Sequence, residues 1–213
     1  MRKLIAVEFI SLDGVIQAPG GPEEDTSNGF TFGGWLAPYG DKSLMEALKI
    51  SYGSPYDLLL GRNTYNIFAN YWPGFEEANK GKPVDESTIN FAKDFNACTK
   101  YVATHSPKTL NWKNSESLGD NIIQKIEDIK KSNNKNLLVV GSSNLVHTLL
   151  AHNLIDELHL YMAPVILGKG KRLFDDTSKA SAFKVVRSVI SETGMSLIHY
   201  VREGEVRTAS IEE

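Results

Sequence analysis

Short apolar runs alternate with amphipathic stretches of helical period along most of the 213 residues, and this alternation constrains the fold more than any other sequence feature. It is typical of βαβ units, in which a helix carries the chain back so that the next strand lies parallel to the last. We expect strands at residues 4–10, 56–60, 101–103, 137–140 and 158–163. The pattern predicts an α/β fold of three layers, with helices on both faces of a mostly parallel sheet.

Acidic residues that can cap a helix precede three of the expected helices. Asp41, Asp85 and Asp120 each stand before apolar residues at helical spacing. Further helices are expected at residues 63–71 and 144–152. The four isoleucines after Asp120 form an apolar stripe, which indicates core packing.

Two long polar loops rich in glycine are expected at residues 11–40 and 72–82. A structureless loop of such length inside a compact domain is usually functional. Near the end of the chain, residues 183–190 and 195–201 flank a four-residue turn and predict an antiparallel hairpin.

Length and composition limit the possible classes of protein. We expect a single domain at residues 1–203, followed by a polar tail at residues 204–213. The net charge of −3 comes from interleaved signs, which disfavours a nucleic-acid partner. A lone cysteine, Cys98, and histidines without ligand spacing make a disulfide framework or a metal site unexpected. No apolar run is long enough to span a membrane, and we expect a cytoplasmic protein.

Three expected strands end in turns whose residues could carry chemistry. The turns are Gly61-Arg62-Asn63-Thr64, Thr104-His105-Ser106 and Gly141-Ser142-Ser143-Asn144-Leu145. Open α/β sheets bind ligands at the carboxyl ends of their strands, where helix N-termini expose free N–H groups and a positive dipole end. Three such turns suit one extended anionic ligand.

A simpler interpretation of the turns is structural: Gly61 and Gly141 permit tight turns, and the hydroxyl side chains cap helices. Arg62 fits this interpretation less well, because it places a fixed cation at a helix start, where the helix dipole disfavours it. A bound phosphate or a surface carboxylate would balance that charge. The common nucleotide fingerprints are absent, since Gly168-Lys169-Gly170 lacks the third glycine and Pro83 follows Gly81-Lys82.

In their order and spacing, these turns and the motifs around them resemble the dihydrofolate reductase-like superfamily. The closest resemblance is to the C-terminal reductase domain of the bifunctional riboflavin-biosynthesis deaminase/reductase and to its free-standing relatives. The motifs are Ser11-Leu12-Asp13-Gly14, Gly33-Gly34-Trp35, Leu60-Gly61-Arg62-Asn63-Thr64-Tyr65, Tyr71-Trp72-Pro73, Val140-Gly141-Ser142-Ser143, residues 154–158 and 164–170, and Leu173-Phe174. They span nearly the whole chain. The deaminase half is missing, because no His-x-Glu occurs with Pro-Cys-x-x-Cys.

The resemblance implies NADPH laid across the strand ends and hydride transfer to a small heterocycle of pterin or pyrimidine type. The implied cofactor-binding residues are Gly61, Arg62 and Thr64 at the phosphates, Thr104, His105 and Ser106 at the adenosine ribose phosphate, the N–H groups of Gly141, Ser142, Ser143, Asn144 and Leu145 at the pyrophosphate, and Ile10, Val15 and Ile16 at the nicotinamide. The resemblance also implies that Ser11 and Trp35 contact the substrate and that Asp13 lies close to it as a catalytic candidate.

Two positions depart from the pattern of this superfamily. Relatives often carry Gly-Gly where this chain has Gly141-Ser142, and in dihydrofolate reductases that bond is cis; the sequence leaves its geometry open here. The acid that assists proton delivery in dihydrofolate reductases would fall near Met45-Glu46. Glu46 is the catalytic candidate if a one-position offset is allowed, and otherwise it is a solvated helix charge.

Two other functions are open. A serine hydrolase would use Ser143 at the strand-to-helix turn, with Asp156, Asp175, His159 and His199 downstream, although Leu145 replaces the second glycine of the nucleophile elbow. The other alternative is a nucleotide-binding protein without turnover. The family resemblance also suggests a homodimer, formed through residues 158–162 and 164–174.

Overall fold

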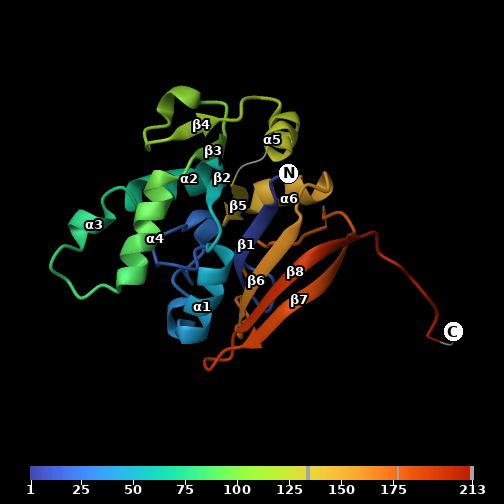
Figure 1. The fold of residues 1–213 in the computed structure, drawn as a ribbon. Helices are drawn as coiled ribbons and strands as arrows, with labels where there is room; N and C mark the ends of the chain where they lie inside the picture. Colours follow the sequence, from blue (N-terminus) through green and yellow to red (C-terminus); the bar gives the residue numbers. More distant parts are fainter. Residues whose placement is uncertain (133–134, 177, 212–213) are drawn as a thin grey trace.

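The computed structural model describes residues 1–132, 135–176 and 178–211 and contains one eight-stranded sheet (Figure 1). The strands are β1 (Leu4–Ser11), β2 (Tyr56–Gly61), β3 (Lys100–Ala103), β4 (Ser115–Ser117), β5 (Asn136–Val140), β6 (Glu157–Ala163), β7 (Ala182–Ile190) and β8 (Ser196–Gly204). Their order across the sheet is β4-β3-β2-β5-β1-β6-β8-β7. The first six strands run parallel, and β8 pairs antiparallel with both β6 and β7. The predicted mixed sheet with a C-terminal hairpin is confirmed.

Helices cover both faces of this sheet. They are α1 (Lys42–Ser51), α2 (Arg62–Tyr71), α3 (Phe75–Ala78), α4 (Glu86–Ala97), α5 (Ile122–Lys131) and α6 (Ser143–Ala151). Side chains of α1, α2 and α4 pack in one apolar cluster, the α1-side core, and those of α5 and α6 pack in another, the α6-side core. Successive strand residues alternate between them, so that Val7 joins the α1-side core and Ala6 the α6-side core. The predicted three-layer arrangement is confirmed.

Two of the three predicted helix caps are present. Asp41 and Asp85 accept hydrogen bonds from backbone N–H groups in the first turns of α1 and α4. The prediction that Asp120 starts a helix is wrong: α5 begins at Ile122, and the Asp120 carboxylate pairs with His105. The isoleucine stripe of α5 packs in the α6-side core as predicted, with Ile126 fully buried.

The loop expected at residues 72–82 is interrupted by α3, whose Phe75 is buried. β4 was not predicted, because Ser115-Glu116-Ser117 has no apolar pattern and pairs only as an edge strand against β3. The turn Thr104-His105-Ser106 leads into a short 3₁₀ turn, η3 (Pro107–Thr109), rather than directly into a helix.

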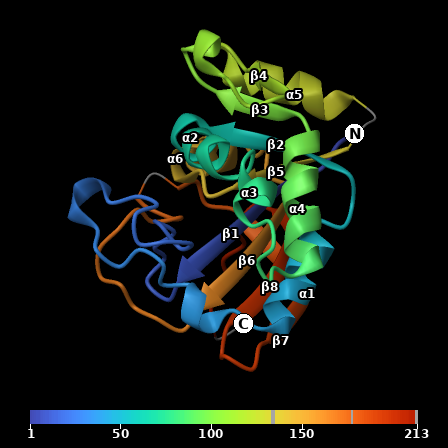
Figure 2. The same cartoon turned by 90° about the vertical axis from the view of Figure 1, so that its left-hand side faces the viewer.

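The loop between β1 and α1 contains two 3₁₀ turns, η1 (Ser27–Gly29) and η2 (Ala37–Tyr39), and is held by the segment that follows β6. The backbone N–H of Ile16 donates to Lys171 at 2.9 Å, and that of Leu173 donates to Gly14 at 2.8 Å. The two segments lie side by side in Figure 2. Gly170 is required at this contact, since a Cβ there would approach Val15 to 2.5 Å and φ is +133°.

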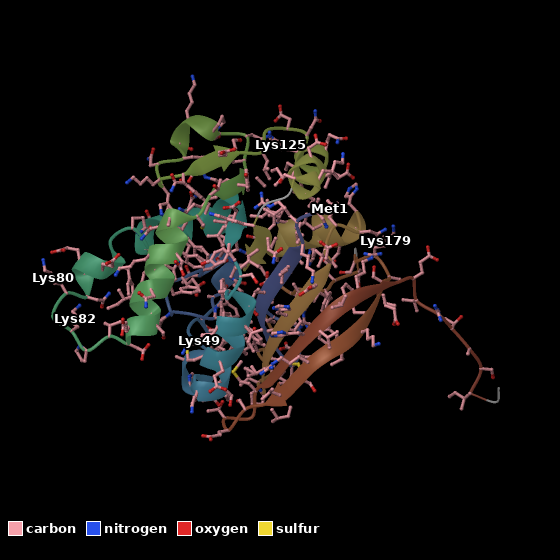
Figure 3. All side chains as sticks on the ribbon, viewed as in Figure 1. Met1, Lys49, Lys80, Lys82, Lys125 and Lys179 are labelled. Atoms are coloured by element: carbon pink, nitrogen blue, oxygen red, sulfur yellow. The ribbon has the colours of Figure 1, made fainter. Side chains whose placement is uncertain are left out.

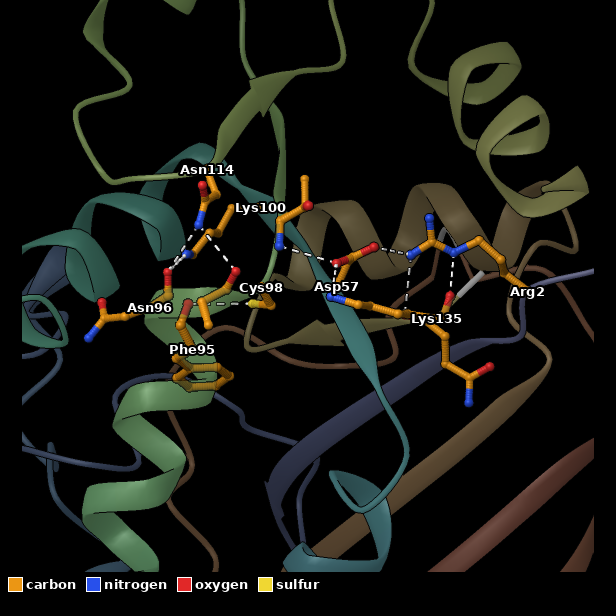
Figure 4. A network of polar contacts seen from close by, with 11 residues as sticks. Arg2, Asp57, Phe95, Asn96, Cys98, Lys100, Asn114 and Lys135 are labelled. Atoms are coloured by element: carbon orange, nitrogen blue, oxygen red, sulfur yellow. Dashed lines mark hydrogen bonds and ion pairs between the residues drawn. The ribbon is translucent and has the colours of Figure 1, made fainter. Parts of the chain in front are cut away.

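A buried ion pair lies at the amino ends of β1 and β2 (Figure 4). The Arg2 guanidinium lies 2.5 Å from the Asp57 carboxylate, and both side chains are almost completely buried. Nearby, burial raises the pKa of the Cys98 thiol to about 11, which fits an inert core cysteine. The buried groups at this end of the sheet therefore serve packing and stability. The labelled lysines of Figure 3, in contrast, lie at the periphery of the molecule.

Candidate functional site

The turn between β2 and α2 is hydrogen-bonded to the turn between β5 and α6. The buried Ser142 hydroxyl accepts from the backbone N–H of Gly61 at 3.0 Å and donates to Oγ1 of Thr64 at 3.0 Å. Thr64 in turn donates to the Gly141 carbonyl at 3.1 Å. Four predicted site residues, Gly61, Thr64, Gly141 and Ser142, therefore join two turns that stand about 80 residues apart in the sequence into one unit at the carboxyl edge of the sheet.

Gly141 lies at the exposed side of this unit in the left-handed region, with φ of +64°. A side chain there would be strained, which explains the glycine. The Gly141–Ser142 bond is trans, since the described residues include no cis peptide. The prediction that the Gly141 N–H faces a pyrophosphate needs correction, because that N–H donates to both carboxyl oxygens of Glu8 at 3.0 Å.

Glu8 is an acid of the central strand β1, and only 1% of its surface is exposed. Its neighbours on the same face of β1, Ala6 and Ile10, belong to the α6-side core. Burial raises the pKa of Glu8 to about 8, and the hydrogen bond from Gly141 opposes this rise only in part. The carboxyl group is therefore mostly protonated at neutral pH.

Arg62 connects the first turn to the end of β3. Its Nη1 lies 3.4 Å from Oγ1 of Thr104 and 3.2 Å from the Ser106 carbonyl, and its Nε donates to Asn66 at 2.9 Å. The bound oxygens are neutral, so the positive charge has no carboxylate partner in the described contacts. The structure thus brings the predicted residues Arg62, Thr104 and Ser106 together.

His105 is not part of this group. Its side chain is 82% exposed and pairs with Asp120 at 2.9 Å. The remaining predicted residues of the third turn form the start of α6: Ser143 is its first residue, Asn144 is exposed, and Leu145 is buried in the α6-side core. The N–H groups of this first turn have no partner within the helix.

A cavity of about 860 Å³ opens beside Arg62, a volume typical of small-molecule sites. α2 forms one wall, and the segment before β4 forms another. The lining residues are Arg62, Tyr65, Asn66, Ala69, Asn70, Pro73, Asn96, Thr109, Asn111, Trp112 and Lys113. Among these lining residues, only Arg62 was predicted to be a site residue.

The residues predicted at the end of β1 are held tightly. The Ser11 hydroxyl donates to Asp13 at 2.6 Å, and Asp13 also accepts from the N–H groups of Leu167 and Gly168. Burial disfavours the charged form of Asp13, but these hydrogen bonds outweigh it and lower its pKa. Asp13 is therefore ionised at neutral pH and braces the segment after β6.

Val15 and Ile16, predicted at the nicotinamide, are buried on opposite sides, in the α1-side and α6-side cores respectively. Ile10 is buried with Ile16 in the α6-side core. Trp35 is 7% exposed and donates its indole N–H to the Gln17 carbonyl at 2.8 Å. Trp35 belongs to the loop between β1 and α1, and its ring packs in the α1-side core.

Glu46 lies on the solvent side of α1. Its side chain is 57% exposed and its carboxylate is 3.9 Å from Lys42. This is the position of the solvated helix charge described as its alternative. Asp13 is ionised at neutral pH and Glu46 is exposed to solvent, so neither matches the buried, protonated acid of a proton donor.

The serine-hydrolase residues are not assembled. His159 lies 2.6 Å from the buried Ser51 hydroxyl, and His199 lies 3.1 Å from the Tyr161 hydroxyl. Asp156 accepts from Lys130 at 2.6 Å. Within the described part of the chain, no hydrogen bond joins Ser143 to a histidine.

The described residues include no group of three potential metal ligands. No described helix is long and apolar enough to cross a membrane.

Glu8 and the Thr64–Ser142 contact are the parts of the site that sequence reasoning missed. The signal for Glu8 was present, since it is the one charged residue in the apolar run of residues 4–10. An acid at a buried strand position needs a partner or a proton. Nothing local indicates that the partner is the N–H of Gly141, more than a hundred residues later.

Residues 2–197 match the family described as the RibD C-terminal domain. YyaP of Bacillus subtilis (strain 168), an uncharacterised protein, is 27% identical over 143 residues, which cover 67% of this chain and 72% of YyaP. A structure described as a riboflavin biosynthesis protein of Shewanella sp. PV-4 has a TM-score of 0.58 at 18% identity, covering 95% of this chain and 99% of that one. Dihydrofolate reductase of Enterococcus faecalis, solved with NADP(H) and RAB-propyl, also has a TM-score of 0.58, at 16% identity, covering 94% and 96%. At these identities the two structures show a shared fold.

Proposed function

The chain belongs to the RibD C-terminal domain family, and from this premise we propose that it is an NADPH-dependent reductase of a small heterocycle of pterin or pyrimidine type. Its reductase-type fold is shared with a dihydrofolate reductase solved with NADP(H). When bound, the cofactor supplies a hydride, and the protein supplies position and protection from water.

The observation that carries the proposal is the joining of three strand-end turns around one cation. Arg62 reaches the end of β3, while Thr64 and Ser142 hold the turns of β2 and β5 together. A guanidinium hydrogen-bonded only to neutral oxygens, beside the N-termini of α2 and α6, is suited to an anionic ligand.

The chain's own residues fit a nucleotide with phosphates. Arg62 would bind a phosphate, and the free N–H groups at the start of α6 would face the pyrophosphate. Gly61 keeps the first turn narrow, and a Cβ there would contact the Ser142 hydroxyl at 3.4 Å. The hydroxyls of Thr64 and Ser142 form hydrogen bonds within the turns themselves, so in this proposal these side chains position backbone groups.

The substrate side of the proposal rests on the family resemblance. Ser11, Asp13, Trp35 and Glu46 stay predictions there, as do Val15, Ile16 and His105 on the cofactor side. The engaged Asp13 and the exposed Glu46 favour one alternative function, a protein that binds NADPH without turning over a substrate. The expected cytoplasmic location also stays a prediction.

We further propose that two copies of the chain associate. β7 is an edge strand, and the part of the sheet formed by β6, β8 and β7 carries exposed apolar residues, among them Val185 and Ile190. Long exposed edge strands of this kind are usually covered in native proteins. The predicted dimer region comprised residues 158–162, which lie in β6, and residues 164–174 after it.

Fluorescence titration with NADPH and NADH, followed by absorbance at 340 nm with oxidised pterins and pyrimidines, tests the function. We expect saturable NADPH binding and NADPH oxidation with at least one heterocycle. Binding without any oxidation across both substrate classes would support the non-catalytic alternative. No NADPH binding at millimolar concentration would rule out both.

A further inference from the structure

The buried acid Glu8 lies directly beneath the exposed turn at Gly141. Both of its carboxyl oxygens lie 3.0 Å from the Gly141 N–H, and the Gly141 carbonyl accepts from Thr64 at 3.1 Å. Both polar groups of Gly141 are therefore taken by side chains from other elements. This fixes the direction in which the next N–H groups, at the start of α6, point.

The surroundings of Glu8 leave its charge without a counterion. Leu160 of β6 is its neighbour across the sheet on one side, and Val140 of β5 pairs with the preceding residue, Val7, on the other. Among the described residues, no lysine, arginine, histidine or acidic side chain forms a hydrogen bond or ion pair with Glu8, and its charge acts on the phenol of Tyr52. A carboxylate in such a place is costly.

The position of Glu8 sets it against the ligand of this site. A nucleotide over the α6 turn would bring negative phosphates close to Gly141, and an ionised Glu8 would add a second negative charge below it in a region of low dielectric. A protonated Glu8 keeps the hydrogen bond to Gly141 and carries no charge. The two requirements of the site, a fixed turn and no opposing charge, are both met by the neutral acid.

We propose that Glu8 is a positioning residue of the nucleotide site, which fixes the Gly141 turn as a neutral acid and weakens nucleotide binding when it ionises. This inference rests on the proposed function, because it needs an anionic nucleotide at the turn. Glu8 acts through Gly141 and is given no contact with substrate.

The expected measure is the pH dependence of NADPH affinity. Because burial raises the pKa of Glu8 to about 8, most of the protein is in the neutral form at pH 7 and only a tenth or so at pH 9. If the neutral form alone binds well, the dissociation constant rises roughly 10-fold between these pH values. The 2′-phosphate is already mostly ionised at pH 7, since its second pKa is about 6.

The experiment compares wild type, Glu8→Gln and Glu24→Gln by NADPH titration at pH 7, 8 and 9. Glutamine keeps an oxygen for the Gly141 N–H and cannot ionise, so the affinity of Glu8→Gln should stay flat within about 2-fold. Glu24 is the matched control: it accepts from the N–H groups of Gly20 and Gly21, and burial raises its pKa too. Glu24→Gln should keep the wild-type pH dependence. Lys100, whose pKa burial lowers to about 8, is present in all three proteins and therefore contributes equally to each.

A second readout does not depend on the nucleotide. The carboxyl carbon of Glu8, followed by NMR in the free protein, should titrate near pH 8, and the Gly141 amide signal should shift with it. If wild type binds NADPH with the same affinity at pH 7 and 9, or if Glu8→Gln shows the wild-type loss, the inference is wrong while the proposed function stands. If NADPH does not bind at any pH, the proposed function fails, and the inference fails with it even where Glu8 titrates as described.

Discussion

Arg62 and Glu8 are two ionisable residues of one site, and at neutral pH Arg62 carries its charge whereas Glu8 is neutral. Arg62 is half-buried and contacts the neutral oxygens of Thr104 and Ser106, so its charge is available to a ligand. Glu8 is fully buried and keeps its proton at neutral pH because its ionised form has no counterion. Arg62 is therefore the charged member of this pair at neutral pH, although the whole chain carries a net charge of −3.

Replacing Arg62 by alanine should weaken NADPH binding by roughly 10- to 150-fold. A charge-assisted hydrogen bond to a phosphate contributes about 1.5–3 kcal/mol, and the alanine variant loses it. Lysine should restore the affinity in part, because a point charge lacks the planar fork. Titration with NADPH and NADH measures the effect: an equal loss for both indicates a pyrophosphate contact, and a loss confined to NADPH indicates the 2′-phosphate.

The control for Arg62→Ala is Lys108→Ala, which removes a cation from the neighbouring exposed turn η3. Thermal unfolding should show both variants within about 1 kcal/mol of wild type, since these side chains lie at the surface. An unchanged affinity of Arg62→Ala for both nucleotides would remove Arg62 from the site and weaken the cofactor assignment as a whole.

Glu8→Gln should make the protein more stable at alkaline pH. The pKa of Glu8 is about 8 in the folded chain and near 4.5 when unfolded, so between these values the folded state holds a proton that the unfolded state has lost. The free energy of unfolding of wild type should therefore fall as pH rises from about 5 to 8. Glutamine removes this dependence, and urea unfolding at pH 5, 7 and 9 measures it. Parallel pH profiles for the two proteins would contradict a buried, uncompensated carboxyl group.

At the scale of elements, α1 is fastened to the sheet at both ends. At its start, the carboxylate of Asp41 caps Leu44 N–H and also accepts from the N–H of Thr193 in the turn between β7 and β8. At its end, the Ser51 hydroxyl lies between His159 and Tyr161 of β6. Because α1 lies on the face where the substrate is expected, these contacts determine how firmly that face is held.

Asp41→Ala should destabilise the protein by about 1–2 kcal/mol, the usual cost of losing a helix N-cap. In a domain of this size the melting temperature should fall by roughly 2–4 °C for each kcal/mol. Burial opposes ionisation of Asp41, but its hydrogen bonds outweigh it and lower the pKa to about 2. The stabilisation is thus present above pH 4 or so and is lost as pH falls toward 2, so the two proteins should converge in acid. Calorimetry at pH 7 and pH 2 checks this, with Asp128→Ala, at an exposed position of α5, as a control near zero; a difference that persists at pH 2 would argue against the cap.

At the scale of the whole molecule, the sheet is covered unevenly. Helices pack against both faces of its centre, whereas β7 and β8 at one edge pack with α1 on one face, through Val189 and Leu197, and carry exposed apolar residues on the other (Figure 1). On the α6 side of that edge, Val185 pairs with Tyr200 and Ile198 with Leu160, which makes an apolar strip of half-buried and exposed side chains.

Past Gly204, residues 205–211 form no helix or strand. The division into a domain at residues 1–203 and a tail stays a prediction that limited proteolysis would test.

The wild-type protein should sediment as a dimer of about 47 kDa, twice the chain mass of 23.6 kDa. Val185→Glu places a charge on the exposed edge strand, where a monomer tolerates it and an apolar interface does not. It should therefore shift the species toward 24 kDa without loss of secondary structure. Val206→Glu, at an exposed apolar residue of the tail, should leave the mass unchanged. A monomeric wild type at micromolar concentration would overturn the dimer.

Local pattern was enough to place most elements. The strand expected at residues 137–140 is β5 (Asn136–Val140), and the helix expected at 63–71 is α2 (Arg62–Tyr71). Periods of two and 3.6 residues, glycine and capping acids are properties of neighbours in the chain, so they can be read without knowing the fold. The same local pattern indicated which strand ends carry polar turns, and with them Arg62.

Tertiary structure alone decided which of these turns meet and what their side chains do there. Ser142 contacts Thr64 across 78 positions, and Gly141 contacts Glu8 across 133. β4 forms by pairing with the edge of β3. Asp13, Trp35 and Glu46 differ in burial, although each belongs to an equally plausible motif or helix in the sequence. Strand order and burial depend on how distant segments close on one another, and such contacts leave no periodicity in the sequence. For that reason the proton on Glu8, which depends on the absence of water and of a counterion, could be found only in the folded chain.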